Sequence, residues 1–134
     1  MNWENNVRRV VPYTPGEQPK IMDVVKLNTN ENPYPPAPNV QKILDDFSAD
    51  EMRLYPDPTA QILIDALAER YHVKPSQVFV GVGSDDVISM AFMTFFNSEK
   101  PVLFPDVTYS FYDVWAEVYR IPYQTIPLTE DFRI

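Results

Sequence analysis

Two glycines, a serine and two adjacent aspartates lie together in the segment GVGSDDVISM, residues 81–90. Paired carboxylates are typical of metal or acid–base sites, whereas a Gly-x-Gly turn that opens a helix is typical of an anion site. Neighbouring helix residues point about 100° apart, so Asp85 and Asp86 make a poor bidentate metal site. The free N–H groups of a first helical turn suit a phosphate. We therefore expect no metal and a phosphate at Gly83, Ser84 and Asp85; a capped core helix without a ligand is the alternative.

Two tyrosines are further candidates for ligand contact. Tyr109 follows PVLF (101–104), a predicted strand, and open α/β sheets bind ligands at the carboxyl ends of their strands. Its ring could stack on a planar cofactor. Tyr55 lies in the proline-stiffened turn RLYPDP (53–58) and presents a hydroxyl group. For both side chains, packing within the protein is the alternative.

The elements that must position these residues follow from the apolar spacing. It predicts helices over 39–47, 59–72, 84–97 and 110–120, and strands over 77–83, 101–104 and 123–128. We expect Asp57 and Pro58 to be the N-cap and first residue of the second helix. Helix 84–97 is apolar on nearly every side, which predicts that protein encloses it. Alternating strands and helices predict an α/β fold with a mostly parallel sheet flanked by helices.

Composition separates an N-terminal arm from a domain. The 134 residues include fourteen prolines and three glycines, and seven of the prolines fall between Pro12 and Pro38. This proline content predicts an extended arm over residues 1–28, followed by a domain over 29–134. The arm cannot bury much of its own surface, so we expect it to lie on another domain or subunit.

Charge and residue usage exclude several classes of partner. A net charge of −8 argues against nucleic acid, because phosphate backbones need basic contacts. The sequence has no apolar run of eighteen residues and no N-terminal signal peptide, and its hydrophobic content of 45% argues against disorder. Without cysteines it has no disulfides or thiolate sites. We expect a cytoplasmic protein with no membrane partner.

Five segments in this order resemble the fold type I pyridoxal-phosphate aminotransferases, and most closely the histidinol-phosphate aminotransferases. They are PYTPGEQ (12–18), KLNTNENPYPP (26–36), RLYPDP (53–58), VGVGSDDVISM (80–90) and PDVTYSFYDVW (105–115). The resemblance implies pyridoxal 5'-phosphate as cofactor and a homodimer. It also implies a role in histidine biosynthesis, in which an amino group moves between histidinol phosphate and 2-oxoglutarate, with the cofactor as electron sink.

The resemblance also implies roles for individual residues. The N–H groups of Ser84 and Asp85 would hold the cofactor phosphate, and Tyr109 would stack on the pyridine ring. Tyr55 would reach across the dimer interface to the cofactor phosphate of the other subunit. Tyr13 would line the substrate pocket, and two further residues would lie near its wall, Asn30 and Glu31.

The family's Schiff-base lysine and substrate arginines are expected beyond residue 134, and no lysine of this chain lies in a matching context. Departures from the family pattern at Val82, Asp86 and Val107 remove no implied ligand, because the phosphate contacts are backbone groups. We therefore expect an N-terminal portion of an aminotransferase, with an incomplete large domain, no catalytic residue of its own and no activity alone. A threonine-phosphate decarboxylase-like enzyme and a non-catalytic remnant that only binds partners are the alternatives.

Overall fold

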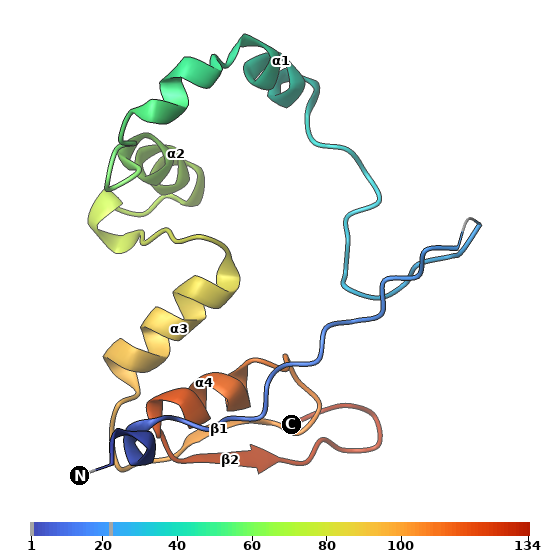
Figure 1. The fold of residues 1–134 in the computed structure, drawn as a ribbon, viewed down its shortest axis with the longest axis vertical. Helices are drawn as coiled ribbons and strands as arrows, with labels where there is room; N and C mark the ends of the chain where they lie inside the picture. Colours follow the sequence, from blue (N-terminus) through green and yellow to red (C-terminus); the bar gives the residue numbers. More distant parts are fainter. Residues whose placement is uncertain (1, 22) are drawn as a thin grey trace. The chain divides into compact units, whose positions relative to one another are not determined.

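The computed structural model describes residues 2–21 and 23–134 (Figure 1). They form two compact units. The first consists of the segment that ends at Thr14 together with Phe79–Ile134, and the second is Pro15–Val78. In the described part of the chain, no helix has both the length and the apolar character needed to cross a bilayer.

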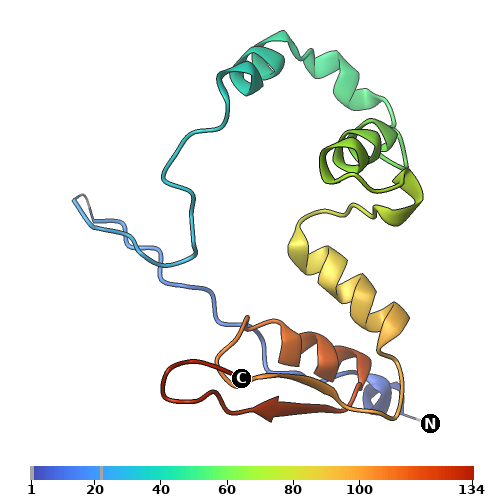
Figure 2. The same cartoon turned by 180° about the vertical axis from the view of Figure 1, so that it is seen from behind.

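The first unit contains a small parallel sheet. Strand β1 (Val102–Pro105) pairs with β2 (Tyr123–Ile126), in a register that sets Val102 opposite Tyr123 and Pro105 opposite Ile126. Helix α4 (Tyr112–Tyr119) connects the strands and lies over one face of the pair (Figures 1 and 2). Parallel strands require such a crossover, and the chain is therefore mixed α/β, as the alternation of apolar segments predicts.

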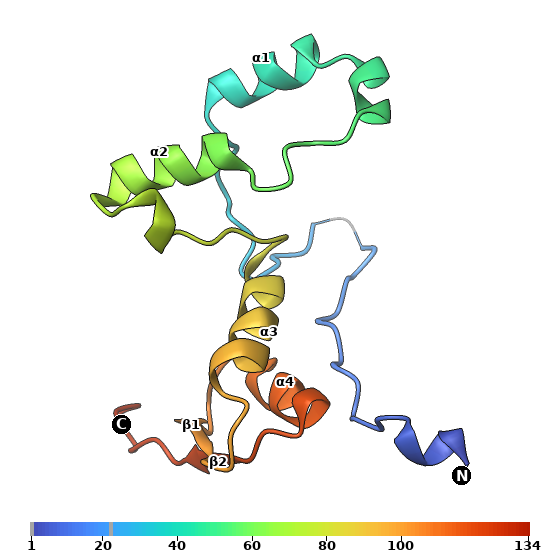
Figure 3. The ribbon, with the colours of Figure 1, turned by 90° about the vertical axis from the view of Figure 1, so that its left-hand side faces the viewer.

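The core of this unit lies between α4 and helix α3 (Ser84–Phe95), which pack together (Figure 3). Phe92, Ala116 and Ile121 are buried at its centre. The hydroxyl oxygens of Ser89 and Tyr119 lie 2.6 Å apart and join the two helices. The partly buried residues around this centre are Ile88, Val102, Tyr112, Trp115 and Tyr119. A short 3-10 helix, Trp3–Asn6, also belongs to this unit.

The second unit contains helices α1 (Pro38–Asp46) and α2 (Gln61–Tyr71) and two 3-10 helices, Ala49–Arg53 and Pro75–Gln77. Its described residues before Pro38 form no helix or strand, as their proline content predicts. Helix 39–47 is confirmed, but its predicted apolar stripe is not buried here, since Ile43 and Leu44 are both exposed.

The strand predicted over 77–83 is wrong. The chain forms a 3-10 helix at Pro75–Gln77 and is irregular from Val78 to Gly83. A strand needs a neighbour for its N–H and C=O groups, and the described sheet consists of β1 and β2 alone, so two predicted strands form instead of three.

Two other local predictions need correction. Helix α3 is not enclosed, because α4 packs on one side of it and leaves Met93 and Phe95 more than half exposed. Asp57 and Pro58 are not the N-cap and first residue of α2, which begins at Gln61 after a left-handed Ala60. Asp57 still caps this helix from further away, because its Oδ2 accepts the N–H of Gln61 at 2.7 Å.

Candidate cofactor-phosphate site

The turn before α3 is built on two glycines. Gly83 has φ +86° and ψ 167°, a backbone conformation essentially restricted to glycine. A Cβ on Gly81 would lie 2.7 Å from Oδ2 of Asp86 and 2.9 Å from Cγ2 of Val87, so only glycine fits there without movement. The same Asp86 oxygen accepts the N–H of Val82 at 3.0 Å. This bond fixes the turn against the helix that follows.

The first turn of α3 offers free hydrogen-bond donors. Gly83 supplies no side-chain cap, and within residues 2–21 and 23–134 the N–H groups of Ser84, Asp85 and Asp86 have no acceptor. These groups carry the partial positive charge of a helix N-terminus. Because nothing lies within 4 Å of a Cβ built on Gly83, the approach to them is open. The turn can therefore receive an anion.

Tyr109 reaches this turn from the loop that follows β1. Its hydroxyl donates a hydrogen bond to Oδ1 of Asp85 at 2.7 Å. This bond is the main cause that raises the pKa of Tyr109, with burial and the negative charge of Asp85 adding to it. The structure thus brings together four of the five predicted cofactor residues, Gly83, Ser84, Asp85 and Tyr109.

The hydrogen bond of the Asp85 side chain was missed from the sequence, from which only the backbone N–H of this residue was expected to contact a ligand. The two bonded residues are 24 positions apart, and no periodic pattern indicates such a contact. Phe111 was missed as well. Its ring centroid lies 5.7 Å from that of Tyr109 and 4.6 Å from that of Tyr13. Tyr13, a predicted substrate residue, is therefore one aromatic ring away from Tyr109.

Tyr55 lies in the second unit and is fully exposed, at 101% of its reference area. The turn that carries it is nonetheless well held. Oδ1 of Asp57 accepts the N–H of Thr59 at 3.0 Å and its hydroxyl at 2.8 Å, beside the bond to Gln61. These bonds, led by that from the Thr59 N–H, lower the pKa of Asp57.

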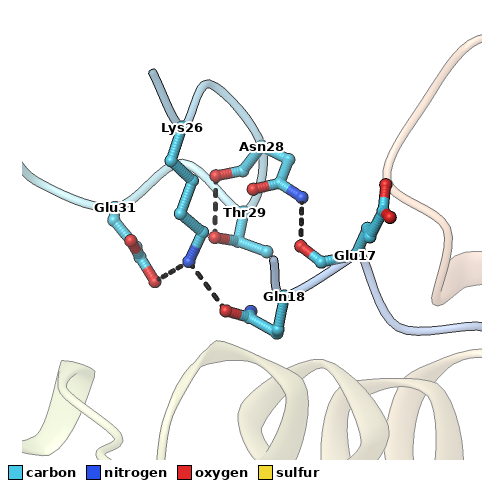
Figure 4. A network of polar contacts seen from close by, with 6 residues as sticks. All are labelled: Glu17, Gln18, Lys26, Asn28, Thr29 and Glu31. Atoms are coloured by element: carbon cyan, nitrogen blue, oxygen red, sulfur yellow. Dashed lines mark hydrogen bonds and ion pairs between the residues drawn. The ribbon is translucent and has the colours of Figure 1, made fainter. Parts of the chain in front are cut away.

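Asn30 and Glu31 also lie in the second unit, in a segment that doubles back on itself. The ammonium group of Lys26 bridges the carboxylate of Glu31 and the side-chain oxygen of Gln18 (Figure 4). The hydrogen bond from Lys26 lowers the pKa of Glu31. Asn30 has a left-handed backbone, with φ +52°. The sequence did not indicate the Lys26–Glu31 pair.

The described ranges contain no group of three histidine, aspartate or glutamate side chains that could hold a metal ion. The donors at the α3 turn are N–H groups, which bind anions and not cations.

A model of the family aminotransferase class I and II matches residues 22–134. The chain belongs to this family. A histidinol-phosphate aminotransferase of Lactococcus lactis subsp. cremoris (strain MG1363) is 55% identical over 134 residues, which are all of this chain and 38% of that protein. Histidinol-phosphate aminotransferase 1 of Hydrogenovibrio crunogenus is 52% identical, and covers 98% of this chain with 37% of its own length.

The resemblance drawn from the five sequence segments is therefore confirmed. Histidinol-phosphate aminotransferase of Clostridium botulinum (strain Hall) is also similar, with 47% identity over 132 residues. The chain spans less than two fifths of the length of these relatives. Enzymes of this family use pyridoxal phosphate.

The α3 turn fits the phosphate group of that cofactor. The first turn of α3 has three free N–H groups, and Gly83 beside them has no side chain that would block a phosphate. Two carboxylates lie in the same helical turn, and both are held by hydrogen bonds within the protein. Asp86 accepts from the N–H of Val82, and Asp85 accepts from the hydroxyl of Tyr109. The donor set, the space and the neighbouring ring therefore agree with a phosphorylated planar ligand.

Proposed function

We propose that this chain provides the phosphate- and ring-binding part of a pyridoxal-phosphate-dependent aminotransferase that acts on histidinol phosphate and 2-oxoglutarate. The observation that carries the proposal is the open N-terminus of α3 with Tyr109 bonded beside it at 2.7 Å. The names of the three relatives support the transaminase over the decarboxylase-like alternative.

In this proposal, the residues at the turn bind and orient the cofactor. The N–H groups of Ser84 and Asp85 donate to its phosphate, and Gly83 lets the phosphate approach. The face of the Tyr109 ring lies against the pyridine ring. When bound, the cofactor withdraws electrons from the substrate bond that breaks. The protein's contribution here is a fixed position for that group.

We extend the proposal to a homodimer in which Tyr55 reaches the cofactor phosphate of the other subunit. Its full exposure supports this role, because a hydroxyl that has no hydrogen-bond partner among residues 2–21 and 23–134 is available to a group from outside. Tyr13, Asn30 and Glu31 would then lie on the substrate side. Residues 1–28 would form an arm, and 29–134 would be part of a fold type I large domain in which β1 and β2 belong to a larger parallel sheet.

A chimera tests the cofactor site. Residues 1–134 replace the matching 38% of the Lactococcus lactis relative, and binding of pyridoxamine 5'-phosphate is measured. This ligand has no aldehyde, so it reports phosphate and ring contacts without a bond to lysine. Ser84 is the first residue of α3, where proline is tolerated, so Ser84→Pro removes a single donor N–H. We expect affinity to fall at least about tenfold, the effect of one hydrogen bond to a charged group.

The matched control is Ser84→Ala, which keeps the N–H and removes only the hydroxyl, and it should change affinity by less than about threefold. Equal affinity of Ser84→Pro and the unmodified chimera for pyridoxamine 5'-phosphate would contradict the phosphate site.

The chimera should transaminate histidinol phosphate, whereas the 134-residue chain alone should not, because none of its lysines lies in a matching context. Turnover by the chain alone would show that one of its own lysines performs the catalytic step.

A further inference from the structure

The hydrogen bond between Tyr109 and Asp85 is the contact that joins the loop after β1 to the first turn of α3. It spans 24 residues of sequence and is 2.7 Å long. Tyr109 remains 43% exposed, so one part of the ring is available to a ligand while its hydroxyl is held.

Two aromatic rings that follow Tyr109 closely in the sequence also restrain it. Phe111 lies at 5.7 Å between centroids, with the ring planes tilted by 31°. Tyr112 lies at 5.9 Å in an edge arrangement, with the planes at 79°. A tyrosine ring has two rotatable side-chain bonds, so contacts with two neighbouring rings and a hydrogen bond at its tip together fix the direction of its face. Such a ring loses little conformational freedom when a ligand binds.

We propose that the carboxylate of Asp85 is a positioning group, which holds the Tyr109 ring in the orientation that stacks on a planar phosphorylated cofactor. This inference rests on the proposed function, since it concerns the same site. Asp85 would then act twice. Its N–H would bind the phosphate and its side chain would fix the ring, so that one residue sets the distance between the two contacts.

An ionised carboxylate suits this role better than a neutral acceptor. A hydrogen bond to a charged acceptor is about twice as strong as a neutral one, and the N-terminus of α3 favours the charge. A tyrosine hydroxyl with the ordinary pKa of about 10 is protonated at neutral pH, and the pKa of Tyr109 is raised further by its bond to Asp85, so the donor is present.

The first test is a pH titration of Tyr109 by ultraviolet absorbance of tyrosinate, on the 134-residue chain and on the chimera. The absorbance of the Tyr109→Phe variant is subtracted from that of each protein, so that the difference reports the titration of Tyr109. In Asp85→Asn we expect the pKa of Tyr109 to fall toward the ordinary value of about 10. The matched control is Asp86→Asn, which removes the same charge from the same helical turn without touching Tyr109, and most of the shift should remain. An unshifted Tyr109 in the unmodified protein overturns the inference.

The second test separates positioning from simple electrostatics in the chimera. A carboxylate beside a phosphate repels it, so Asp85→Asn should leave affinity for inorganic phosphate equal or higher. Affinity for pyridoxamine 5'-phosphate should nevertheless fall about threefold to tenfold, the range for loss of one ordered contact. The fall in Tyr109→Phe should be at least as large, because asparagine at position 85 can still accept a weaker hydrogen bond. The double variant should be no weaker than the weaker single one, because both changes act on the same restraint.

Four results would overturn the positioning role, the proposed function or both. Additive losses in the double variant, or tighter binding of both ligands in Asp85→Asn, overturn the positioning role. No binding of pyridoxamine 5'-phosphate by the unmodified chimera overturns the proposed function and the ligand role of this pair with it. A normal pKa of Tyr109 beside intact ligand binding overturns the positioning role alone.

Discussion

Two tyrosines are proposed to contact the cofactor, Tyr109 beside the α3 turn and Tyr55 in the RLYPDP turn, and they differ in what surrounds them. At the α3 turn, Tyr109 is bonded to Asp85 and lies beside two aromatic rings. At the RLYPDP turn, Tyr55 is fully exposed, and among the described residues it has no hydrogen-bond or ring partner. Both turns have a fixed backbone, since Asp86 holds the first and Asp57 the second.

The comparison shows that a stiff backbone does not by itself position a side chain. Asp57 accepts three hydrogen bonds within its turn, yet none of them restrains the Tyr55 ring. The Tyr109 ring is restrained because a second element of the same unit supplies a carboxylate. We infer that the α3 turn can be largely preformed within one chain, whereas the RLYPDP turn requires a partner to complete its site.

The largest expected effect is at Gly83. Gly83→Ala places a Cβ on a residue with φ +86° and ψ 167°, at a strain of about 1–3 kcal/mol. The turn should relax and move its N–H groups away from the phosphate. In the chimera, affinity for pyridoxamine 5'-phosphate should fall by up to about a hundredfold, as measured by ligand titration.

The control for Gly83→Ala is Gly16→Ala, in the second unit. Gly16 has no left-handed or related backbone, and an added Cβ would lie 3.1 Å from the movable side-chain carbon Cγ2 of Thr29. Its effect on ligand affinity should be less than about threefold. If Gly83→Ala and Gly16→Ala bind pyridoxamine 5'-phosphate with the same affinity, the backbone of the α3 turn does not preform the ligand site.

The next largest effect concerns Tyr55. Tyr55→Phe removes one hydroxyl bond to the phosphate and should weaken ligand binding in the chimera about tenfold. Mixing Tyr55→Phe subunits with Gly83→Ala subunits tests action across the dimer. In a heterodimer, the intact turn of the first subunit would receive the unmodified Tyr55 of the second. One site per heterodimer should then bind pyridoxamine 5'-phosphate with full affinity.

Action within one subunit gives the opposite result, because every site of the heterodimer would then carry one of the two changes. Only weakened sites would appear in the titration. The control is Tyr34→Phe, another exposed tyrosine of the second unit, which should leave affinity unchanged. A monomeric chimera, or heterodimers without a full-affinity site, would rule out the role assigned to Tyr55.

Local patterns predicted a large part of the fold. The apolar spacing and the Gly-x-Gly turn were enough to place α3 within two residues of its observed end, and the strand–helix–strand order predicted the parallel pairing of β1 with β2. The strand predicted at 77–83 failed for a physical reason. β-branched and aromatic residues indicate a segment suited to a sheet, but they do not provide the neighbouring strand.

Part of the candidate site was also predictable. Helix-terminus physics indicated free N–H groups at Ser84 and Asp85, and the described residues offer these groups no acceptor. Their contact with a phosphate stays a prediction. The bond between Asp85 and Tyr109 depends on how two elements pack, and sequence spacing carries no information about that. The same holds for Lys26 and Glu31, whose pairing depends on the fold of an irregular segment.

The smallest expected effect is on the stiffness of the RLYPDP turn. The pKa of Asp57 is lowered in the folded chain, so its stabilising bonds are present above its ordinary pKa of about 3.9 and are lost as pH falls through the lowered value.

Hydrogen exchange of the Gln61 amide, which bonds to Asp57, measures this loss directly. Protection should fall in that acidic window. It should also fall at neutral pH in Asp57→Asn, which leaves one acceptor oxygen where the carboxylate uses two. The matched control is Asp65→Asn. In the described part of the chain the Asp65 carboxylate accepts only from the side chain of Gln61, so this change should leave the amide protected. Ligand affinity should fall less in Asp57→Asn than in Tyr55→Phe, since a looser turn still presents the hydroxyl. A larger fall would mean that backbone stiffness, and not the hydroxyl, limits what this turn contributes.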